Sequence, residues 1–463
     1  MDRKVGNLGP RFVPVILAGG GHRELWPLSR ANAPVQFLRD ASGRSPFTRW
    51  LGTVRNLPNA APAIIVTSAQ AHDMTHEQAQ LRSDERMIVA AADRGPLPAL
   101  ALAVMDLNEA DTVLAIDAAQ PVPGEDVVQQ ISNTLISAGR HVDGILVGVL
   151  PVTAGAELRR GERDESGAIR AAGRTLNGKE AGYCLSPFVV GCASSIRREL
   201  EMNEPAVMRN VAASVAGGSQ HGQVIFPAAT PWTSLEARSD GALECASWPA
   251  SRLRPVALET DGSGRAMLTA NRVRGDALVH ASRACDVRAH DHLTVLCGVE
   301  NLRVWTTPDA TLVAAPGHEG AIAEIADRLM FDERPEAFAH LVETAEWGSV
   351  HPIAEAPAGV RLDLLRLREG AVLEPDELAA GGVMTLLAGL ATVAGEAVRH
   401  GETIDGGPLS AIEPTVLLRT VFTASQGSRE ARPSQGEQQP QTEALVELLE
   451  RGTEQEAPCE DAA

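Results

Sequence analysis

Residues 13–38 read VPVILAGGGHRELWPLSRANAPVQFL, and this stretch decides the fold of the first part of the chain. Val13 to Leu17 form a short continuous apolar run, which is typical of a parallel strand covered on both faces. Gly19, Gly20 and Gly21 follow at once. Glycines let backbone N–H groups approach an anion closely, because no Cβ is in the way. The stretch therefore predicts a buried strand that runs into a phosphate-facing loop.

The residues that follow extend this pattern. The first 240 residues alternate short apolar runs with helix-like segments, which is the pattern of an α/β domain with a mostly parallel sheet. Pro205 stands at a plausible first-turn position of one helix. We expect strands at 13–18, 63–67, 86–91, 112–116 and 144–149, and helices at 69–81, 97–108, 125–138, 194–201 and 205–216.

The second half of the chain is richer in strand-like pieces. Short runs separated by turn residues such as Gly298 and Asn301 suggest a small β-helix or β-roll, and later runs suggest a β-sandwich. The runs lie at 277–280, 293–296, 302–306, 311–314, 360–367, 383–387, 391–393 and 415–422, with a helix at 320–330. The expected domains are 11–255, 256–335 and 345–423, followed by a disordered acidic tail at 424–463.

Composition excludes several classes of protein. The 463 residues carry a formal charge of −19, which argues against nucleic acid as a partner, because polyanion binding rests on lysine and arginine. Six cysteines without CxxC spacing indicate free thiols in a reducing compartment. No leader-like segment and no apolar run of about 18 residues is evident, so we expect no membrane partner and a cytoplasmic location.

The opening stretch resembles the signature of bacterial mannose-1-phosphate guanylyltransferases of the long type, fused to a mannose-6-phosphate isomerase domain. That signature reads roughly LAGGSGTRLWPLSR and then PKQF, and this chain matches it at 17–20, 25–30, Pro34, Gln36 and Phe37. Residues 299–314 resemble the family's VGVEDLVVVDTPDAVLVA, and 346–349 resemble its lead into a cupin domain. The resemblance implies a nucleotidyltransferase domain, a small β-helix-like domain and a degenerate cupin β-sandwich.

The resemblance also implies candidate site residues for GTP, mannose 1-phosphate and the product GDP-mannose. Asp117 aligns with a metal-binding aspartate of the family and ends a predicted strand, so it is the candidate ligand for Mg²⁺. Arg23 is the one catalytic candidate, because it stands one place before the lost loop arginine. The implied nucleotide-binding residues are Leu17, Ala18, Gly19, Gly20, Gly21, Gln36 and Arg94.

Several departures from the family pattern fall on the chemistry. His22-Arg23-Glu24 replaces Gly-Thr-Arg, and Val35 replaces the lysine of PKQF. Ser234 stands at the family's second metal aspartate; Glu236 could reach in from two residues on, or be a surface residue. At the sugar end, Arg174 could replace a phosphate-binding lysine, or be solvated.

The isomerase half has lost its expected metal ligands. A cupin metal site needs clustered histidines, but no histidine occurs between His351 and His400. We therefore expect no cupin metal and no isomerase activity. The pair His290 and His292 is more typical of an exposed strand edge than of a ligand set.

Two hypotheses follow for function. The chain is either a working or weakened guanylyltransferase, or a non-catalytic pseudoenzyme that keeps the scaffold for binding and regulation. The second fits the coincidence of losses at the loop, the lysine, the second aspartate, the hexose motif and the cupin metal. Such a protein would form a homo-oligomer or pair with an active relative through its β-rich domain.

Overall fold

The computed structural model describes most of the chain, with gaps. The described residues are 12–40, 42–119, 145–152, 160–163, 169–172, 182–236, 253–257, 272–315, 318–356, 359–374, 382–404 and 407–422. The helix expected at 125–138, Arg174 and the acidic tail lie outside them. No helix within these ranges is long and apolar enough to cross a membrane.

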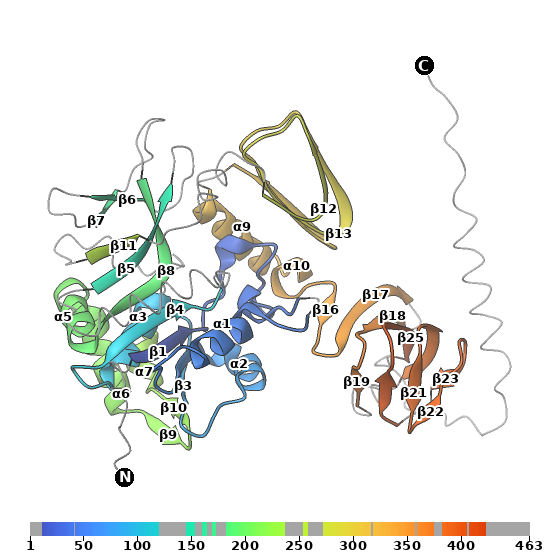
Figure 1. The fold of residues 1–463 in the computed structure, drawn as a ribbon, viewed down its shortest axis with the longest axis horizontal. Helices are drawn as coiled ribbons and strands as arrows, with labels where there is room; N and C mark the ends of the chain where they lie inside the picture. The colour runs from blue at the N-terminus through green and yellow to red at the C-terminus, as the bar shows by residue number, and fades with distance from the viewer. Residues whose placement is uncertain are drawn as a thin grey trace, which may run out of the picture.

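An α/β sheet forms the first part of the molecule, with strand order β11-β5-β8-β4-β1-β2-β3-β10-β9 (Figure 1). Its centre is parallel, since β1 pairs in parallel with β2 and β4, and β3 pairs in parallel with β2 and β10. The mostly parallel sheet confirms the expected fold class. The central strands are β1 (Phe12–Leu17), β2 (Ile64–Ser68), β3 (Arg86–Ala90) and β4 (Thr112–Asp117), and the flanking strands are β5 (Ile145–Val152), β8 (Gly182–Cys192), β9 (Ser219–His221), β10 (Val224–Phe226) and β11 (Leu253–Ala257).

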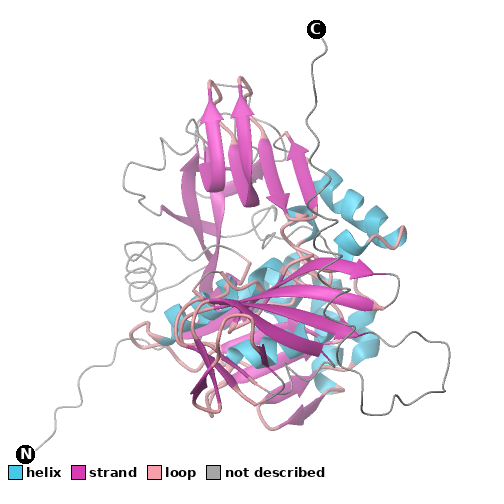
Figure 2. Ribbon diagram, turned by 90° about the vertical axis from the view of Figure 1, so that its right-hand side faces the viewer, coloured by secondary structure: helices cyan, strands magenta, loops and turns pink. Residues whose placement is uncertain are grey.

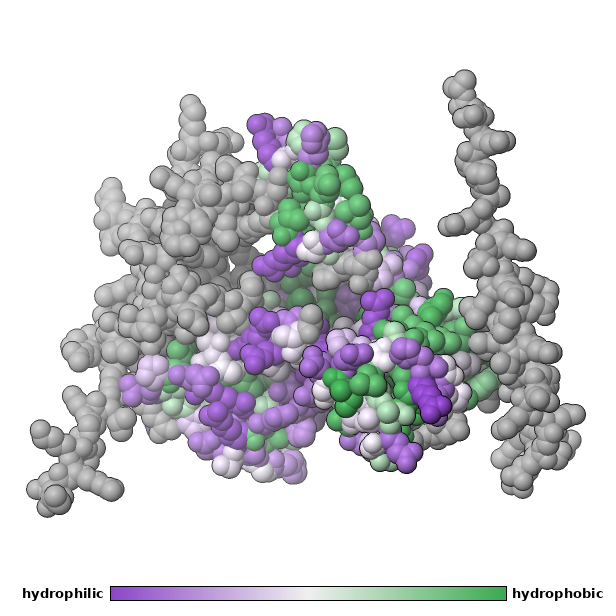
Figure 3. Space-filling model, turned by 45° about the vertical axis from the view of Figure 1, so that its right-hand side comes forward, coloured by the Kyte–Doolittle hydropathy of each residue, from purple (hydrophilic) through white to green (hydrophobic). Residues whose placement is uncertain are grey.

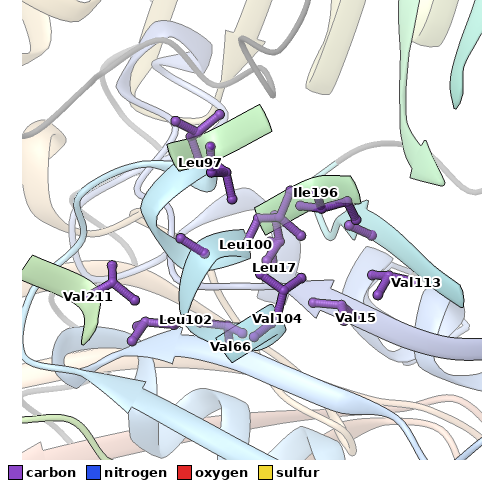
Figure 4. Close-up of a cluster of buried hydrophobic side chains, with 14 of the residues drawn as sticks. Val15, Leu17, Val66, Leu97, Leu100, Leu102, Val104, Val113, Ile196 and Val211 are labelled. Atoms are coloured by element: carbon purple, nitrogen blue, oxygen red, sulfur yellow. The ribbon is translucent and has the colours of Figure 1, made fainter. Parts of the chain in front are cut away.

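Two helical layers cover this sheet because alternate strand residues point to opposite faces. One core holds Val15, Leu17 and Val66 with residues of α3 (Pro96–Met105), α5 (Ala193–Asn203), α6 (Pro205–Ala216) and α7 (Ala229–Thr233), as Figure 4 shows in part. The other packs Ile16, Ile65 and Met87 against α1 (Pro46–Arg55) and α2 (His72–Ala79). The central strands are thus buried on both faces, as their continuous apolar runs predicted.

A second sheet has strand order β12-β13-β14-β15, with bounds Arg272–His280, Asp286–Cys297, Arg303–Thr307 and Ala310–Ala314. The first three strands pair in parallel, which is the stacking of a β-helix. Leu278 and Val295 are paired across β12 and β13, and both are more than half exposed. Figure 3 shows green, apolar areas among the purple, hydrophilic ones on the surface of the molecule. Helices α9 (Glu319–Phe331) and α10 (Pro335–Phe338) follow this sheet.

The C-terminal part is a β-sandwich of two further sheets (Figure 2). Leu365, Met384 and Leu417 of one sheet pack against Leu373 and Leu409 of the other. The first sheet has order β16-β17-β18-β25-β20-β23 (Glu343–Thr344, Gly348–Ala356, Val360–Leu367, Thr415–Phe422, Gly382–Ala388, Thr403–Ile404), and the second β19-β24-β21-β22 (Val372–Leu373, Leu409–Ala411, Ala391–Val393, Glu396–Ala397).

Candidate functional site

The glycine loop lies at the carboxyl edge of the α/β sheet, where open parallel sheets bind their ligands. Leu17 ends β1 and is paired with Asp117, the last residue of β4. The Ala118 N–H then donates to Leu17 O at 2.9 Å, and the Ala18 N–H donates to Val66 O at 2.8 Å. The predicted loop and the predicted metal ligand therefore start from neighbouring strand ends.

The three glycines of the loop have different surroundings. A Cβ on Gly19 would lie 2.9 Å from Ser68 N, so Gly19 is needed for the close approach of the loop to β2. Ser68 Oγ donates to Gly19 O at 3.1 Å. The Gly21 N–H donates to Asp93 Oδ2 at 3.2 Å. One of the backbone donors expected to face phosphate is therefore bonded to a carboxylate of the chain itself.

Gln36 and Ser29 hold the loop from beneath. Gln36 is fully buried, and its Nε2 donates to Ala18 O at 2.9 Å and to Gly20 O at 2.6 Å. Ser29 Oγ donates to Gly21 O at 2.7 Å and accepts from the Val35 N–H at 3.0 Å. Gln36 was predicted among the nucleotide-binding residues, and in the structure its amide fixes the shape of the loop.

His22 lies at the centre of the site. Its φ of 48° is in the left-handed region that favours glycine, which is the residue that the family signature has at this position. The imidazole Nδ1 is 3.3 Å from Glu24 Oε1, and Nε2 is 3.5 Å from Asp117 Oδ1. Burial opposes a charge here, but Asp117, Glu24 and Asp93 outweigh it and raise the pKa of His22 to about 9.

The two arginines predicted for the site point to other partners. Arg23 is exposed and forms an ion pair with Asp327 of α9. Arg94 donates from Nη2 to Thr233 O at 2.9 Å, at the end of α7. Both guanidiniums thus have bonds within the protein, and that of Arg23 joins the loop to the helix that follows the second sheet.

The second half of the loop, Leu25 to Gln36, packs against the second sheet, a role that the sequence analysis missed. The buried Arg30 forms two bonds of 2.7 Å to the carboxylate of Asp309, at the turn between β14 and β15. Trp26 Nε1 donates to Glu336 O at 3.0 Å. Leu28 packs with Trp305 and Ile322. The α9 helix lies beside this part of the loop in Figure 1.

The residues present do not fit the Mg²⁺ site that the resemblance implies. Asp117 accepts the Ala119 N–H at 3.0 Å and has His22 as its neighbouring cation. Ser234 is exposed and its Oγ donates to Pro231 O, while Glu236 is an exposed residue just beyond α7. Within the described ranges, no three His, Cys, Asp or Glu residues are grouped so that they could hold a metal ion.

Two cavities of about 210 Å³ border this sheet. One lies beyond the carboxyl ends of β2 and β3, near the glycine loop, and is lined by Ala69, His72, Val89, Ala91, Phe226 and Pro227. The other lies at the amino ends of the strands and includes the ion pair between Arg55 and the buried Glu85, whose atoms Nε and Oε1 are 2.8 Å apart. The first could receive a flat ring, because aromatic and apolar side chains form its wall.

A mostly parallel sheet with a glycine loop at its carboxyl edge is the arrangement that the resemblance to sugar nucleotidyltransferases implies. No protein-family model matches the chain. It is 25% identical over 384 residues to the mannose-1-phosphate guanylyltransferase of Salmonella montevideo, covering 74% of this chain and 79% of that protein. It is 24% identical over 371 residues to the alginate biosynthesis protein AlgA of Pseudomonas aeruginosa, covering 73% and 76%.

These relatives confirm the resemblance seen in the sequence. The chain is homologous to proteins named mannose-1-phosphate guanylyltransferase over about three quarters of its length. A solved structure described as mannose-1-phosphate geranyltransferase from Thermus thermophilus is 19% identical and has a TM-score of 0.48, covering 69% of this chain and 99% of that one.

Proposed function

We propose that this protein is a non-catalytic homologue of mannose-1-phosphate guanylyltransferase that keeps the scaffold for binding and regulation. The observation that carries the proposal is the charge around the glycine loop. Asp93, Asp117 and Glu24 surround His22, and Asp93 accepts the Gly21 N–H. Transfer of a nucleotidyl group needs cations around the phosphates, because negative charge builds up there.

The substituted positions support this proposal. Glu24 stands where the family signature has arginine, and Val35 stands where it has lysine. Two unit charges 4 Å apart near a protein surface interact with about 4 kcal/mol, so a carboxylate in place of a guanidinium reverses a large favourable interaction with triphosphate. Arg23 does not compensate, because its guanidinium pairs with Asp327 of α9.

A pyrophosphate-release assay tests the proposal directly. The full chain is incubated with GTP, mannose 1-phosphate and Mg²⁺, and the Salmonella montevideo relative serves as the positive control. We expect no release above the protein-free background. Turnover at about 1 per second or faster, the ordinary range of enzymes, would overturn the proposal.

Calorimetry separates binding from turnover. The full chain is titrated with GTP and with GDP-mannose, each with and without Mg²⁺. Binding of GDP-mannose without turnover supports a regulatory role, and absence of binding by either ligand contradicts a nucleotide-sensing role.

Pairing with an active relative is part of the same proposal. The exposed pair Leu278 and Val295 on β12 and β13 is the surface we expect to take part, because apolar pairs are buried in stable interfaces. Light scattering of the full chain, alone and mixed with an active relative, measures the assembly. A monomer under both conditions contradicts this part of the proposal.

A further inference from the structure

We propose that the side chain of His22 is a built-in occupant of the site, which fills the space between the glycine loop and Asp117 and keeps divalent metal off that carboxylate. This inference rests on the proposed function, because a guanylyltransferase of this family would need the metal. It goes further by naming the group that closes the site.

The backbone of the loop aims His22 into the site. A non-glycine residue at φ 48° is strained, since its Cβ crowds the backbone in the left-handed region. The family signature has glycine here, so the loop keeps the backbone shape of that glycine while carrying an imidazole. The side chain is only 9% exposed, which places it within the protein and not in solvent.

The imidazole covers the middle of the loop. A Cβ built on Gly20 would lie 3.0 Å from His22 Nε2, which shows how closely the ring approaches this residue. A ligand phosphate that bonded to the backbone of Gly20 would need this space, because phosphate cradles depend on unobstructed N–H groups. His22 therefore obstructs the loop sterically.

The same ring lies close to the Asp117 oxygen that would bind a metal. Mg²⁺ binds carboxylate oxygen at about 2.0–2.1 Å, and His22 Nε2 is 3.5 Å from Asp117 Oδ1. A metal on that oxygen would be within a few ångströms of the imidazole nitrogen, which Glu24 holds from the other side through Nδ1. The ring therefore takes up space that a metal on this oxygen and its other ligands would need.

Two other groups near the expected metal position, Ser234 and Asp93, are bonded to the chain itself. Ser234 takes the place of the second aspartate and is exposed, and its hydroxyl is bonded to Pro231 O. Asp93 is committed to the N–H groups of Gly21 and Gly95, at 3.2 and 2.9 Å. The structure therefore assigns the position beside Asp117 to the His22 side chain.

Mn²⁺ binding to the full chain tests this inference by a readout other than activity. Electron paramagnetic resonance counts free Mn²⁺ in titrations of the wild type, Asp117→Asn, His22→Gly and the double variant His22→Gly/Asp117→Asn. We expect no Asp117-dependent binding in the wild type. His22→Gly should bind Mn²⁺ at least about tenfold more tightly, and the double variant should lose that gain.

Gln80→Gly is the matched control. Gln80 is another non-glycine residue in the left-handed region, at φ 42°, and lies at the end of α2, so its replacement relieves similar strain without changing the site. It should leave Mn²⁺ binding at the wild-type level. Mn²⁺ binding by the wild type that Asp117→Asn abolishes, or no gain in His22→Gly, would overturn the inference.

Different experimental results would contradict the role assigned to His22 and the proposed function. Pyrophosphate release by the wild type at about 1 per second or faster overturns the proposed function whatever the Mn²⁺ titration shows. Asp117-dependent Mn²⁺ binding by an inactive wild type overturns only the role assigned to His22.

Discussion

The two halves of the loop, Gly19 to Glu24 and Leu25 to Gln36, have different surroundings. In the second half, Val35 departs from the family signature, but Ser29, Arg30 and Gln36 match it, and all three hold one part of the chain to another. In the first half, His22 and Glu24 depart from it, and both lie among the carboxylates of the site. The retained residues are those that build the scaffold, so a match to this signature reports the fold more directly than the reaction.

The largest loss of unfolding free energy should come from Arg30→Ala. This change leaves Asp309 without its two bonds from a fully buried guanidinium, and breaking a buried ion pair costs about 3–5 kcal/mol of unfolding free energy. Urea denaturation measures the loss. Arg23→Ala is the control, because its pair with Asp327 is about half exposed on both sides and should contribute less than about 1 kcal/mol. Equal losses in the two variants would break the distinction between the halves.

A smaller effect is expected for Gln36→Ala. The change removes the donor to Ala18 O and Gly20 O within a buried site, so we expect a loss of about 2 kcal/mol in unfolding free energy. Gln220→Ala, which removes one bond to Gly222 O at an exposed site, should cost less than half as much. A neutral Gln36→Ala would show that the loop keeps its shape without this amide.

Restoring the residues of the family signature should tighten the binding of GTP. A variant with His22→Gly, Arg23→Thr, Glu24→Arg and Val35→Lys has the charges of the family signature, and we expect it to bind GTP at least about tenfold more tightly, or about 1.4 kcal/mol. Calorimetry measures the change. Glu369→Arg, an exposed residue far along the sequence, controls for net charge. An equal gain in both variants would mean that the loop has no special part in binding.

Acidification should give the smallest change in unfolding free energy. Burial favours the neutral form of Asp309, but hydrogen bonds from Arg30 and Thr307 outweigh it and hold the pKa of this carboxyl below its usual value. Its contribution to stability is therefore present above about pH 4, the usual pKa of aspartate, and is lost as the pH falls through the lower folded value. The difference in unfolding free energy between wild type and Asp309→Asn should shrink below that pH, and a constant difference would contradict this.

The central strands could be predicted because burial on both faces leaves a continuous apolar run. The structure gives α6 the bounds predicted for it, 205–216, where Pro205 marks the first turn. Helix α1 was missed although its signals are present. Ser45 and Thr48 form a capping box, and Phe47, Trp50, Leu51 and Val54 share one buried face.

The site was harder to predict than the fold, because its decisive contacts join residues far apart in sequence. Asp93 meets Gly21 across 72 residues, and Arg30 meets Asp309 across 279. The signature identified Arg30 and Gln36 as matching residues, but only the folded chain shows that they bond to protein atoms. The direction of the His22 side chain depends on a left-handed backbone conformation, which no local pattern in this chain predicts.

Only Arg23–Leu25, a single 3-10 turn, separates His22 from Trp26. Trp26 is bonded to Glu336 of α10, and Arg23 is bonded to Asp327 of α9. The helices after the second sheet are therefore bonded to the residues one and four positions after His22, so a shift of those helices would act on the chain next to the imidazole.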